Sequence, residues 1–372
     1  MQQLIAIQIL RAIAAGMVVF YHSQNDAGHA AAEIGARFAR FTPLPWAAGV
    51  DLFFVVSGFV MVLSSGSLFA SPGGATRFLG RRIARIVPLY WLATTIFLAA
   101  VLRGAAAGKV LAPTLGESLA SFAFLPWPRV LDGAPRPIHS LGWTLEYEMF
   151  FYFVFAVFIR LPRARAVAGV AAALAALVAW NWAAAPQNVA LAFWSDPIVL
   201  EFALGMAIAL AYGAGVRVSA KVAVVLAALA LAALAIDPMN SAAEPFDAVA
   251  PNGFLRLFSW GAPMAALFAA ATFGPAPAAP GPGLRALAKV GDASYALYLF
   301  HPLALIALRK VWLAAHLDVA IGFWPLVVAS TLASIVLALA IHIWIERPLT
   351  KAAQQWLSPR LPAKTAGAAA PV

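Results

Sequence analysis

Residues 4–22 read LIAIQILRAIAAGMVVFYH, an apolar stretch with one arginine in its middle and a histidine at its end. A helix needs ~17 to 25 residues to span the hydrocarbon layer of a membrane. No basic residue precedes Arg11, which interrupts the apolar run, and no clear cleavage site follows Tyr21 and His22. We therefore expect a retained transmembrane helix rather than a cleaved signal peptide.

The rest of the chain has the same apolar character. Of its 372 residues, 63% are hydrophobic and only 11% charged, whereas soluble domains are nearer one half and one quarter. The absence of cysteine excludes disulfides, thiolate nucleophiles and cysteine metal sites. The net charge of +10 comes from short basic clusters between apolar runs, a pattern that orients membrane helices. A lipid bilayer is the expected partner, and nucleic acid is not.

The apolar runs predict an all-α, polytopic bundle of about ten transmembrane helices. The expected starts, each uncertain by several residues, are roughly Leu4, Ala47, Ile86, Trp143, Ala166, Ala190, Val222, Phe254, Asp292 and Phe323. The stretch from Thr114 to Trp127 is short and bounded by prolines, so we expect an interfacial half-helix there.

Charge asymmetry predicts the orientation of this bundle. Most of the 25 arginine and lysine residues lie in loops on the side of the amino terminus, which predicts that both termini are cytoplasmic. The expected location is a bacterial-type cytoplasmic (inner) membrane. Residues 1–352 are expected to form the transmembrane domain. Residues 353–372, rich in alanine and proline, are expected to be a disordered tail.

Two ionisable residues in the first helix are functional candidates, because each costs on the order of 3 kcal/mol at membrane depth. Arg11 and His22 are eleven residues apart, which puts them on one helix face, about 16 Å apart along the axis. The alternative is that Arg11 pairs with a carboxylate for structure and His22 lies among the outer headgroups.

The second helix begins GVDLFFVVSGF at residues 49–59. It enters from outside, so Asp51 is expected at the depth of His22, where a carboxylate would fix the imidazole tautomer that a general base needs. The alternative is that Asp51 caps the helix. Ser57, further along the helix, is a second polar candidate.

A basic cluster follows on the cytoplasmic side. Arg81, Arg82 and Arg85 could clamp phosphate groups through their forked guanidinium donors. The alternative is a positive anchor against anionic lipid.

The fourth helix has two carboxylates, Glu146 and Glu148, near Trp143, Tyr147 and Tyr152. Aromatic rings and carboxylates at the outer shoulder of a helix are typical of a sugar-facing site. An aromatic belt is the alternative, and it explains Trp143 better than Glu148, which lies more than a turn inside.

The ninth helix places Ser294, Tyr298 and His301 on one face, with Pro302 kinking the helix beside the histidine. At the end of the last span, Glu346 is expected to reach the cytoplasmic arginines.

Together these motifs resemble the acyltransferase family 3 membrane proteins, which O-acylate envelope and secreted glycans. The resemblance extends from Leu4 to about Pro348 and is closest to the exopolysaccharide-modifying branch. The motifs that carry it are Arg11 with His22, Gly49 to Phe59, Arg81/Arg82/Arg85 to Pro88, Trp143/Leu145/Glu148/Tyr152, Ser294 to His301, and Glu346/Pro348.

The resemblance implies a ten-helix acyltransferase domain that uses acetyl coenzyme A or a similar donor. It further implies that Arg11 and His22 are essential and that Asp51 and Glu148 belong to the active site. The chain departs from the usual family pattern at Glu146 and Met149, which puts the surroundings of Glu148 in doubt. No extracellular hydrolase domain is expected after the last span.

From these residues we predict that acyl coenzyme A is a co-substrate, with no metal and no tightly bound cofactor. The expected donor site comprises Arg11, Arg81, Arg82 and Arg85, and the catalytic residues are His22, Asp51 and Glu148. The acceptor is a saccharide, either free or lipid-linked, and Ser57, Trp143, Tyr152, Tyr298 and His301 are expected to line its path. Direct transfer and a covalent relay through His22 or Ser57 both remain open.

A transporter or flippase for a lipid-linked sugar is the rival hypothesis, since intramembrane charges also line transport paths. A structural membrane subunit would leave those charges without a role.

Overall fold

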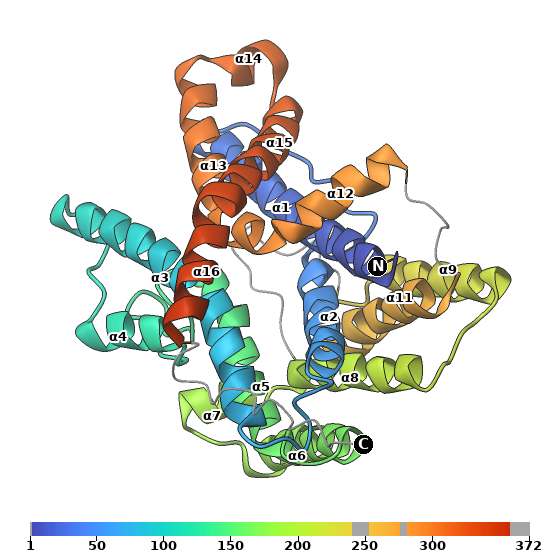
Figure 1. Cartoon of the computed structure of the whole chain (residues 1–372). Helices are drawn as coiled ribbons and strands as arrows, with labels where there is room; N and C mark the ends of the chain where they lie inside the picture. The colour runs from blue at the N-terminus through green and yellow to red at the C-terminus, as the bar shows by residue number, and fades with distance from the viewer. Residues whose placement is uncertain (1, 240–252, 276–280, 358–372) are drawn as a thin grey trace, which may run out of the picture.

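The protein is a bundle of α-helices in the computed structural model, which describes residues 2–239, 253–275 and 281–357 (Figure 1). Its helices are α1 (Gln2–Glu33), α2 (Gly49–Ser64), α3 (Gly74–Ala106), α4 (Leu115–Ala123), α5 (Trp143–Phe158), α6 (Arg163–Ala184), α7 (Val189–Trp194), α8 (Leu200–Gly213), α9 (Ala220–Ile236), α10 (Phe254–Arg256), α11 (Ala262–Phe273), α12 (Pro282–Asp292), α13 (Ser294–Ala314), α14 (Leu317–Ile321), α15 (Trp324–Ile341) and α16 (Arg347–Leu357). The predicted all-α fold is confirmed.

Within those described residues, eight helical stretches are long and apolar enough to cross a membrane. Two shorter apolar helices, Pro197–Gly213 and Ala220–Ile236, accompany them. Large apolar side chains such as Trp182 and Val336 face outward, as expected of surfaces in contact with lipid tails. In chain order, these ten helical stretches correspond to the ten predicted segments.

Three helix boundaries differ from the sequence-based expectation. α3 starts at Gly74 rather than near Ile86, because the arginine-rich run before Ile86 continues the helix beyond its apolar part. The sixth segment is divided between α7 and α8, where Asp196 caps a short turn that begins at Pro197. The ninth begins at Ser294, close to the expected start, but it is preceded by a separate helix, α12, that was not expected.

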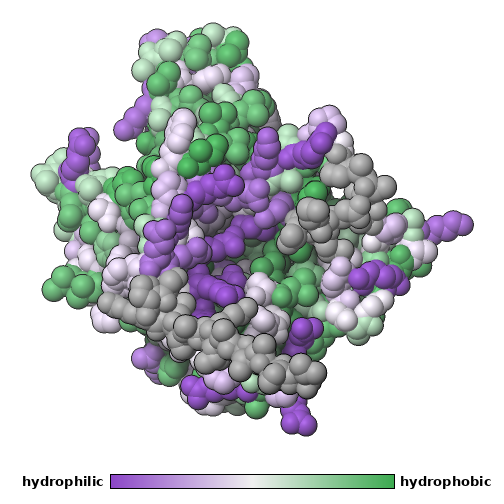
Figure 2. Space-filling model, in the orientation of Figure 1, coloured by the Kyte–Doolittle hydropathy of each residue, from purple (hydrophilic) through white to green (hydrophobic). Residues whose placement is uncertain are grey.

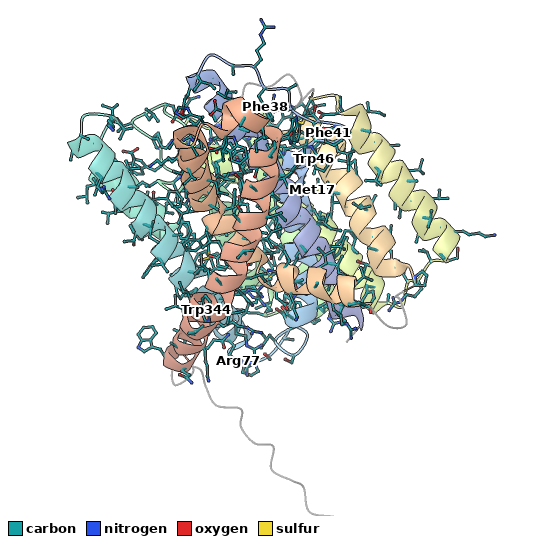
Figure 3. All side chains as sticks on the ribbon, turned by 90° about the horizontal axis from the view of Figure 1, so that it is seen from above. Met17, Phe38, Phe41, Trp46, Arg77 and Trp344 are labelled. Carbon is teal, nitrogen blue, oxygen red and sulfur yellow. The ribbon has the colours of Figure 1, made fainter. Side chains whose placement is uncertain are left out.

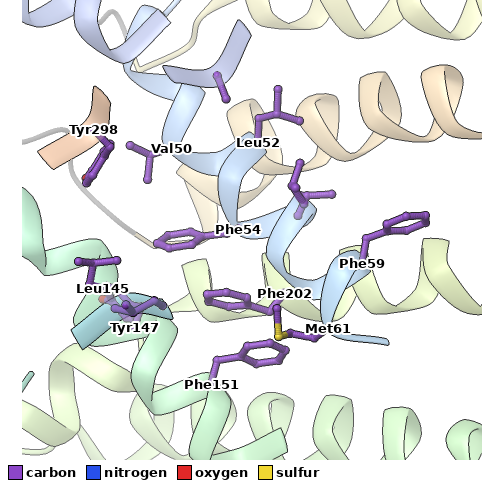
Figure 4. Close-up of a cluster of buried hydrophobic side chains, with 14 of the residues drawn as sticks. Val50, Leu52, Phe54, Phe59, Met61, Leu145, Tyr147, Phe151, Phe202 and Tyr298 are labelled. Carbon is purple, nitrogen blue, oxygen red and sulfur yellow. The ribbon is translucent and has the colours of Figure 1, made fainter. Parts of the chain in front are cut away.

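The centre of the bundle is formed by close packing of α2 against α8. A Cβ atom on Gly58 would lie 2.1 Å from the carbonyl oxygen of Phe202, and one on Gly205 would lie 2.0 Å from that of Val55. Small residues allow two membrane helices to approach this closely. Beside the crossing, the ring of Phe202 packs between Phe54 and Phe151 (Figure 4).

The loops at the two ends of the bundle have different character. Phe38, Phe41 and Trp46 lie at one end, and Arg77 and Trp344 lie at the other (Figure 3). The short helix α4 lies in the stretch expected to be a half-helix, and Thr114 and Glu117 form its capping box. Helix α16 includes residues 353–357 of the predicted tail, and residues 358–372 lie outside the described part.

Candidate active site

Two cavities inside the bundle share the wall residues Val50 and Tyr298. We call the first the arginine cavity; its polar lining includes Arg11, Ser57, Arg82, Arg85, Glu148 and Tyr152. We call the second the histidine cavity; its polar lining includes His22, His29, Arg136, Trp143, Arg256 and His301. Hydrophilic side chains also gather between α12 and α16 on the face seen in Figure 2, with hydrophobic side chains around them.

Two helices run along both cavities. Arg11 lines the arginine cavity and His22 the histidine cavity, so one face of α1 serves both, as the spacing predicts. On α13, Ser294 lines the arginine cavity, His301 the histidine cavity and Tyr298 both. The two cavities are therefore adjacent, and polar side chains of α1 and α13 run past both; we call this row of side chains the polar path.

Three guanidinium groups from two helices line the arginine cavity. Arg82 donates to the hydroxyl oxygen of Ser64 at 2.9 Å, and Arg11 donates to the side-chain oxygen of Gln8 at 3.0 Å. Arg85 lies one turn further along α3. Arg81, which was expected to belong to this cluster, is exposed and does not line the cavity. Arg11 of α1, which was also expected in this cluster, supplies the third guanidinium group.

Glu148 lies in the arginine cavity rather than in an outer sugar site. Its Oε1 atom accepts hydrogen bonds from Ser57 at 2.8 Å and from Tyr152 at 2.5 Å. Glu146 is fully buried and lines neither cavity. The expectation that both carboxylates form a sugar-facing site at the outer shoulder of the helix is wrong: Glu148, more than a turn inside α5, faces the arginine cavity, and Glu146 faces neither cavity.

Glu346 has a partner that was not expected. Its carboxylate bonds to Nδ1 of His342 at 2.8 Å, one turn earlier in a π-helical segment, while its charge also acts on Arg11.

A pair of histidines defines the second cavity. The rings of His22 and His301 lie 5.2 Å apart between centroids, at an interplanar angle of 34°. Nδ1 of His301 lies 3.0 Å from the carbonyl oxygen of Leu297, which can only accept, so Nδ1 carries the proton. Nε2 of a neutral His301 is then a free lone pair, and it has no hydrogen-bond partner among the described residues.

Asp51 is not the partner of His22. Its two carboxylate oxygens accept from Arg256 at 3.0 and 2.9 Å, and both side chains are buried. The predicted Asp51–His22 pair is therefore replaced by an Asp51–Arg256 ion pair, with Glu201 beside it.

Arg256 is the residue that sequence reasoning missed. Its side chain is 2% exposed, lies over Trp143 and Trp260, and lines the histidine cavity. The π-helical turn Leu257–Gly261 follows it directly, and such turns are frequent at functional sites. Its position inside the apolar segment that starts at Phe254 was the available signal.

Tyr298 separates the two cavities. Its hydroxyl donates to the carbonyl oxygen of Leu141 at 3.0 Å and accepts from Oγ1 of Thr144 at 3.0 Å. These bonds hold the ring across the junction, so any ligand joining the two cavities passes along it.

The loop that precedes α5 is fixed by buried groups. His139 stacks on Phe97, with ring centroids 4.2 Å apart. Burial lowers the pKa of His139 to about 4, so this imidazole is neutral near pH 7. The loop carries Arg136 to the histidine cavity.

No three histidine, aspartate or glutamate side chains converge as a metal site within residues 2–239, 253–275 and 281–357.

The sequence of residues 4–343 matches the model of the acyltransferase domain family. The chain belongs to the acyltransferase 3 family. The match includes the lining residues of both cavities named above, and membership makes this acyltransferase 3 chain an acyltransferase. The resemblance inferred from the motifs is confirmed.

This acyltransferase 3 chain is 33% identical over 323 residues to the exopolysaccharide production protein ExoZ of Rhizobium meliloti (strain 1021). The similarity covers 87% of this chain and 94% of the relative. No solved structure matches the chain.

Proposed function

We propose that this acyltransferase moves a short acyl group, such as acetyl, from acyl coenzyme A to a hydroxyl of an envelope or exported polysaccharide. The observation that carries the proposal is the pair of cavities that meet at Tyr298, one lined by arginines and the other by histidines. An anionic thioester donor suits the first, and a hydroxyl that must lose a proton suits the second. The printed name of the relative supports an exopolysaccharide acceptor.

The donor binds in the arginine cavity. Arg82 and Arg85 from α3, with Arg11 from α1, present planar forked donors that match phosphate oxygens. The thin pantetheine arm then follows the shared face of α1 and α13 past Tyr298. About 16 Å of helix separates Arg11 from His22, so an extended arm delivers the thioester to the histidine cavity.

His22 acts as the general base in the histidine cavity. The acceptor hydroxyl gives its proton to His22 while its oxygen attacks the thioester carbonyl carbon. A carbon–oxygen bond forms and the carbon–sulfur bond breaks. Coenzyme A leaves as a thiolate and takes the proton from His22, so the ester and free coenzyme A are the products. The neighbouring His301 ring, whose Nε2 atom has a free lone pair, stabilises the positive charge of the imidazolium that forms between these steps.

We place this site in a chain that crosses the bacterial inner membrane ten times, with both termini in the cytoplasm. Eight long and two short apolar helices support the crossings. The separation of Arg77 from Phe38 and Trp46 at opposite ends of the bundle supports a cytoplasmic donor entrance (Figure 3).

The test uses the purified full chain in lipid nanodiscs, with acetyl coenzyme A and an oligosaccharide fragment of an exopolysaccharide. We expect release of coenzyme A that depends on the acceptor, with an alkali-labile acetyl ester on the saccharide detected by mass spectrometry. A transporter would instead move a labelled lipid-linked sugar across a liposome membrane without any acyl donor. Movement of that kind together with no ester formation would contradict the proposal.

A further inference from the structure

Arg136 is a cation of the histidine cavity that forms no ion pair within the described residues; Asp132, the carboxylate whose charge acts on it, is paired with Arg129. The other charged groups that line this cavity are paired. Arg256 is neutralised by Asp51 at 2.9 Å, and Asp26 lies 3.4 Å from Arg309. The positive charge of Arg136 is therefore not neutralised by an ion pair within the described residues.

The segment that carries Arg136 is held in place by hydrogen bonds to buried side chains. Buried Glu117 accepts from the backbone nitrogen of Val130 at 2.8 Å, and buried Ser121 accepts from that of Ile138 at 2.9 Å. Arg129, just before the first anchor, pairs with Asp132, so the other arginine of the segment is already neutralised. The fold thus holds Arg136 at the cavity and leaves its guanidinium group available.

The charge of Arg136 acts directly on His22. When His22 takes the hydroxyl proton, two cations share a cavity from which water is partly excluded, and their repulsion opposes the transfer. An anion bound to Arg136 would cancel that repulsion at the moment the imidazolium forms.

We propose that the acceptor saccharide carries an anionic group, a carboxylate or a phosphate, that binds Arg136 while a neighbouring hydroxyl faces His22. The inference rests on the proposed function and narrows its acceptor to an acidic saccharide or a saccharide on a phosphate-bearing lipid. Guanidinium binds both oxyanions through parallel hydrogen bonds.

The experiment compares three acceptors on the full chain in nanodiscs of zwitterionic lipid: a neutral oligosaccharide, its uronic acid counterpart, and the neutral oligosaccharide on a lipid diphosphate. Each is assayed with the parent, Arg136→Gln and Arg136→Lys. Arg129→Gln is the matched control, because it removes an arginine of the same segment that is already paired with Asp132.

For the anionic acceptor that the site recognises, we expect Arg136→Gln to raise KM about 10-fold to 100-fold, with partial rescue by Arg136→Lys. KM for acyl coenzyme A should stay as in the parent, and turnover of the neutral oligosaccharide should not fall, because loss of the Arg136 charge removes the repulsion that opposes proton transfer to His22. A higher KM of Arg136→Gln for the uronic acid acceptor alone identifies the anionic group as a carboxylate on the sugar. A higher KM for the lipid diphosphate acceptor alone identifies it as the phosphate of the carrier.

Three results would overturn the inference. Arg136→Gln could leave all three acceptors unchanged, or weaken the neutral and anionic acceptors equally. Activity could also follow the content of anionic bulk lipid rather than the acceptor, which would make Arg136 a headgroup contact. If the parent transferred acyl groups to none of the acceptors, the proposed function itself would fail, and with it this inference.

Discussion

The two cavities use charge in opposite ways. In the arginine cavity, three guanidinium groups face one carboxylate, Glu148, whose Oε1 atom already accepts from two hydroxyls. In the histidine cavity, Arg256 is held by Asp51 through two bonds, and the groups proposed to react are imidazoles. Excess positive charge suits retention of a polyanion, whereas titratable rings beside a neutralised arginine suit movement of a proton. The difference supports the proposed division into a binding end, the arginine cavity, and a chemical end, the histidine cavity, and variants at either end test it.

The largest effect is expected at the chemical end. His22→Ala should lower the rate of acyl transfer by about 100-fold to 10,000-fold, because a methyl group cannot take the hydroxyl proton. The measurement is ester formation per mole of folded protein in nanodiscs, with the binding of coenzyme A measured in parallel. That binding should be unchanged, since His22 lies outside the arginine cavity.

His316→Asn is the matched control, because His316 is exposed and asparagine tolerates its positive φ of 53°. Transfer by His22→Ala at close to the parental rate would remove His22 from the chemistry.

The second effect concerns the buried ion pair. Arg256→Gln leaves Asp51 buried without its partner and should cost about 3 to 5 kcal/mol of stability. We expect a clear fall in the midpoint of thermal unfolding in detergent. The double variant Asp51→Asn with Arg256→Gln should recover part of that loss, because no unpaired charge then remains.

A midpoint that fell equally in the single and double variants would show that the pair is not the source of the stability. Asp51→Asn also addresses the contact expected from sequence: if its loss of transfer were fully reversed by Arg256→Gln, Asp51 would act through Arg256 and not through His22.

The smallest of the three effects is at the binding end. Replacing Arg82 and Arg85 together by lysine keeps the charge that sets orientation but loses the forked donors suited to phosphate. Coenzyme A should bind about 10-fold more weakly, as measured by calorimetry, because bidentate pairing is lost. Arg81→Lys is the control, since Arg81 is exposed and outside the cavity. If Arg81→Lys weakened coenzyme A binding equally, the arginine cluster would instead be a general positive anchor against anionic lipid.

Helix periodicity was sufficient to predict which residues share a helix face. Arg11 with His22 on α1, and Ser294 with Tyr298 and His301 on α13, lie along the polar path as their spacing requires. Periodicity carries no information about how one helix is rotated against another.

That missing rotation explains the errors. Asp51 meets Arg256, which is 205 residues away, through the packing of α2 against the turn after α10. Glu148 turns toward the arginines because its bond to Ser57 joins α5 to α2. Arg81 and Arg85 are one turn apart, yet only Arg85 lines the cavity. The third guanidinium group there, beside those of Arg82 and Arg85, comes from Arg11 of α1. Each outcome depends on a neighbouring helix that the local sequence does not encode.

The ring of Tyr298 has a consequence for the cell as well as for the reaction. A polar path that enters a bundle from both ends is a potential leak for protons, and an energised membrane loses its stored gradient through such leaks. Tyr298 and Val50 form the wall that the two cavities share, and the hydroxyl of Tyr298 is tied to Leu141 and Thr144 rather than left to water. The ring that the thioester arm passes in the proposed mechanism therefore also lies where it would keep the membrane insulating while no donor is bound.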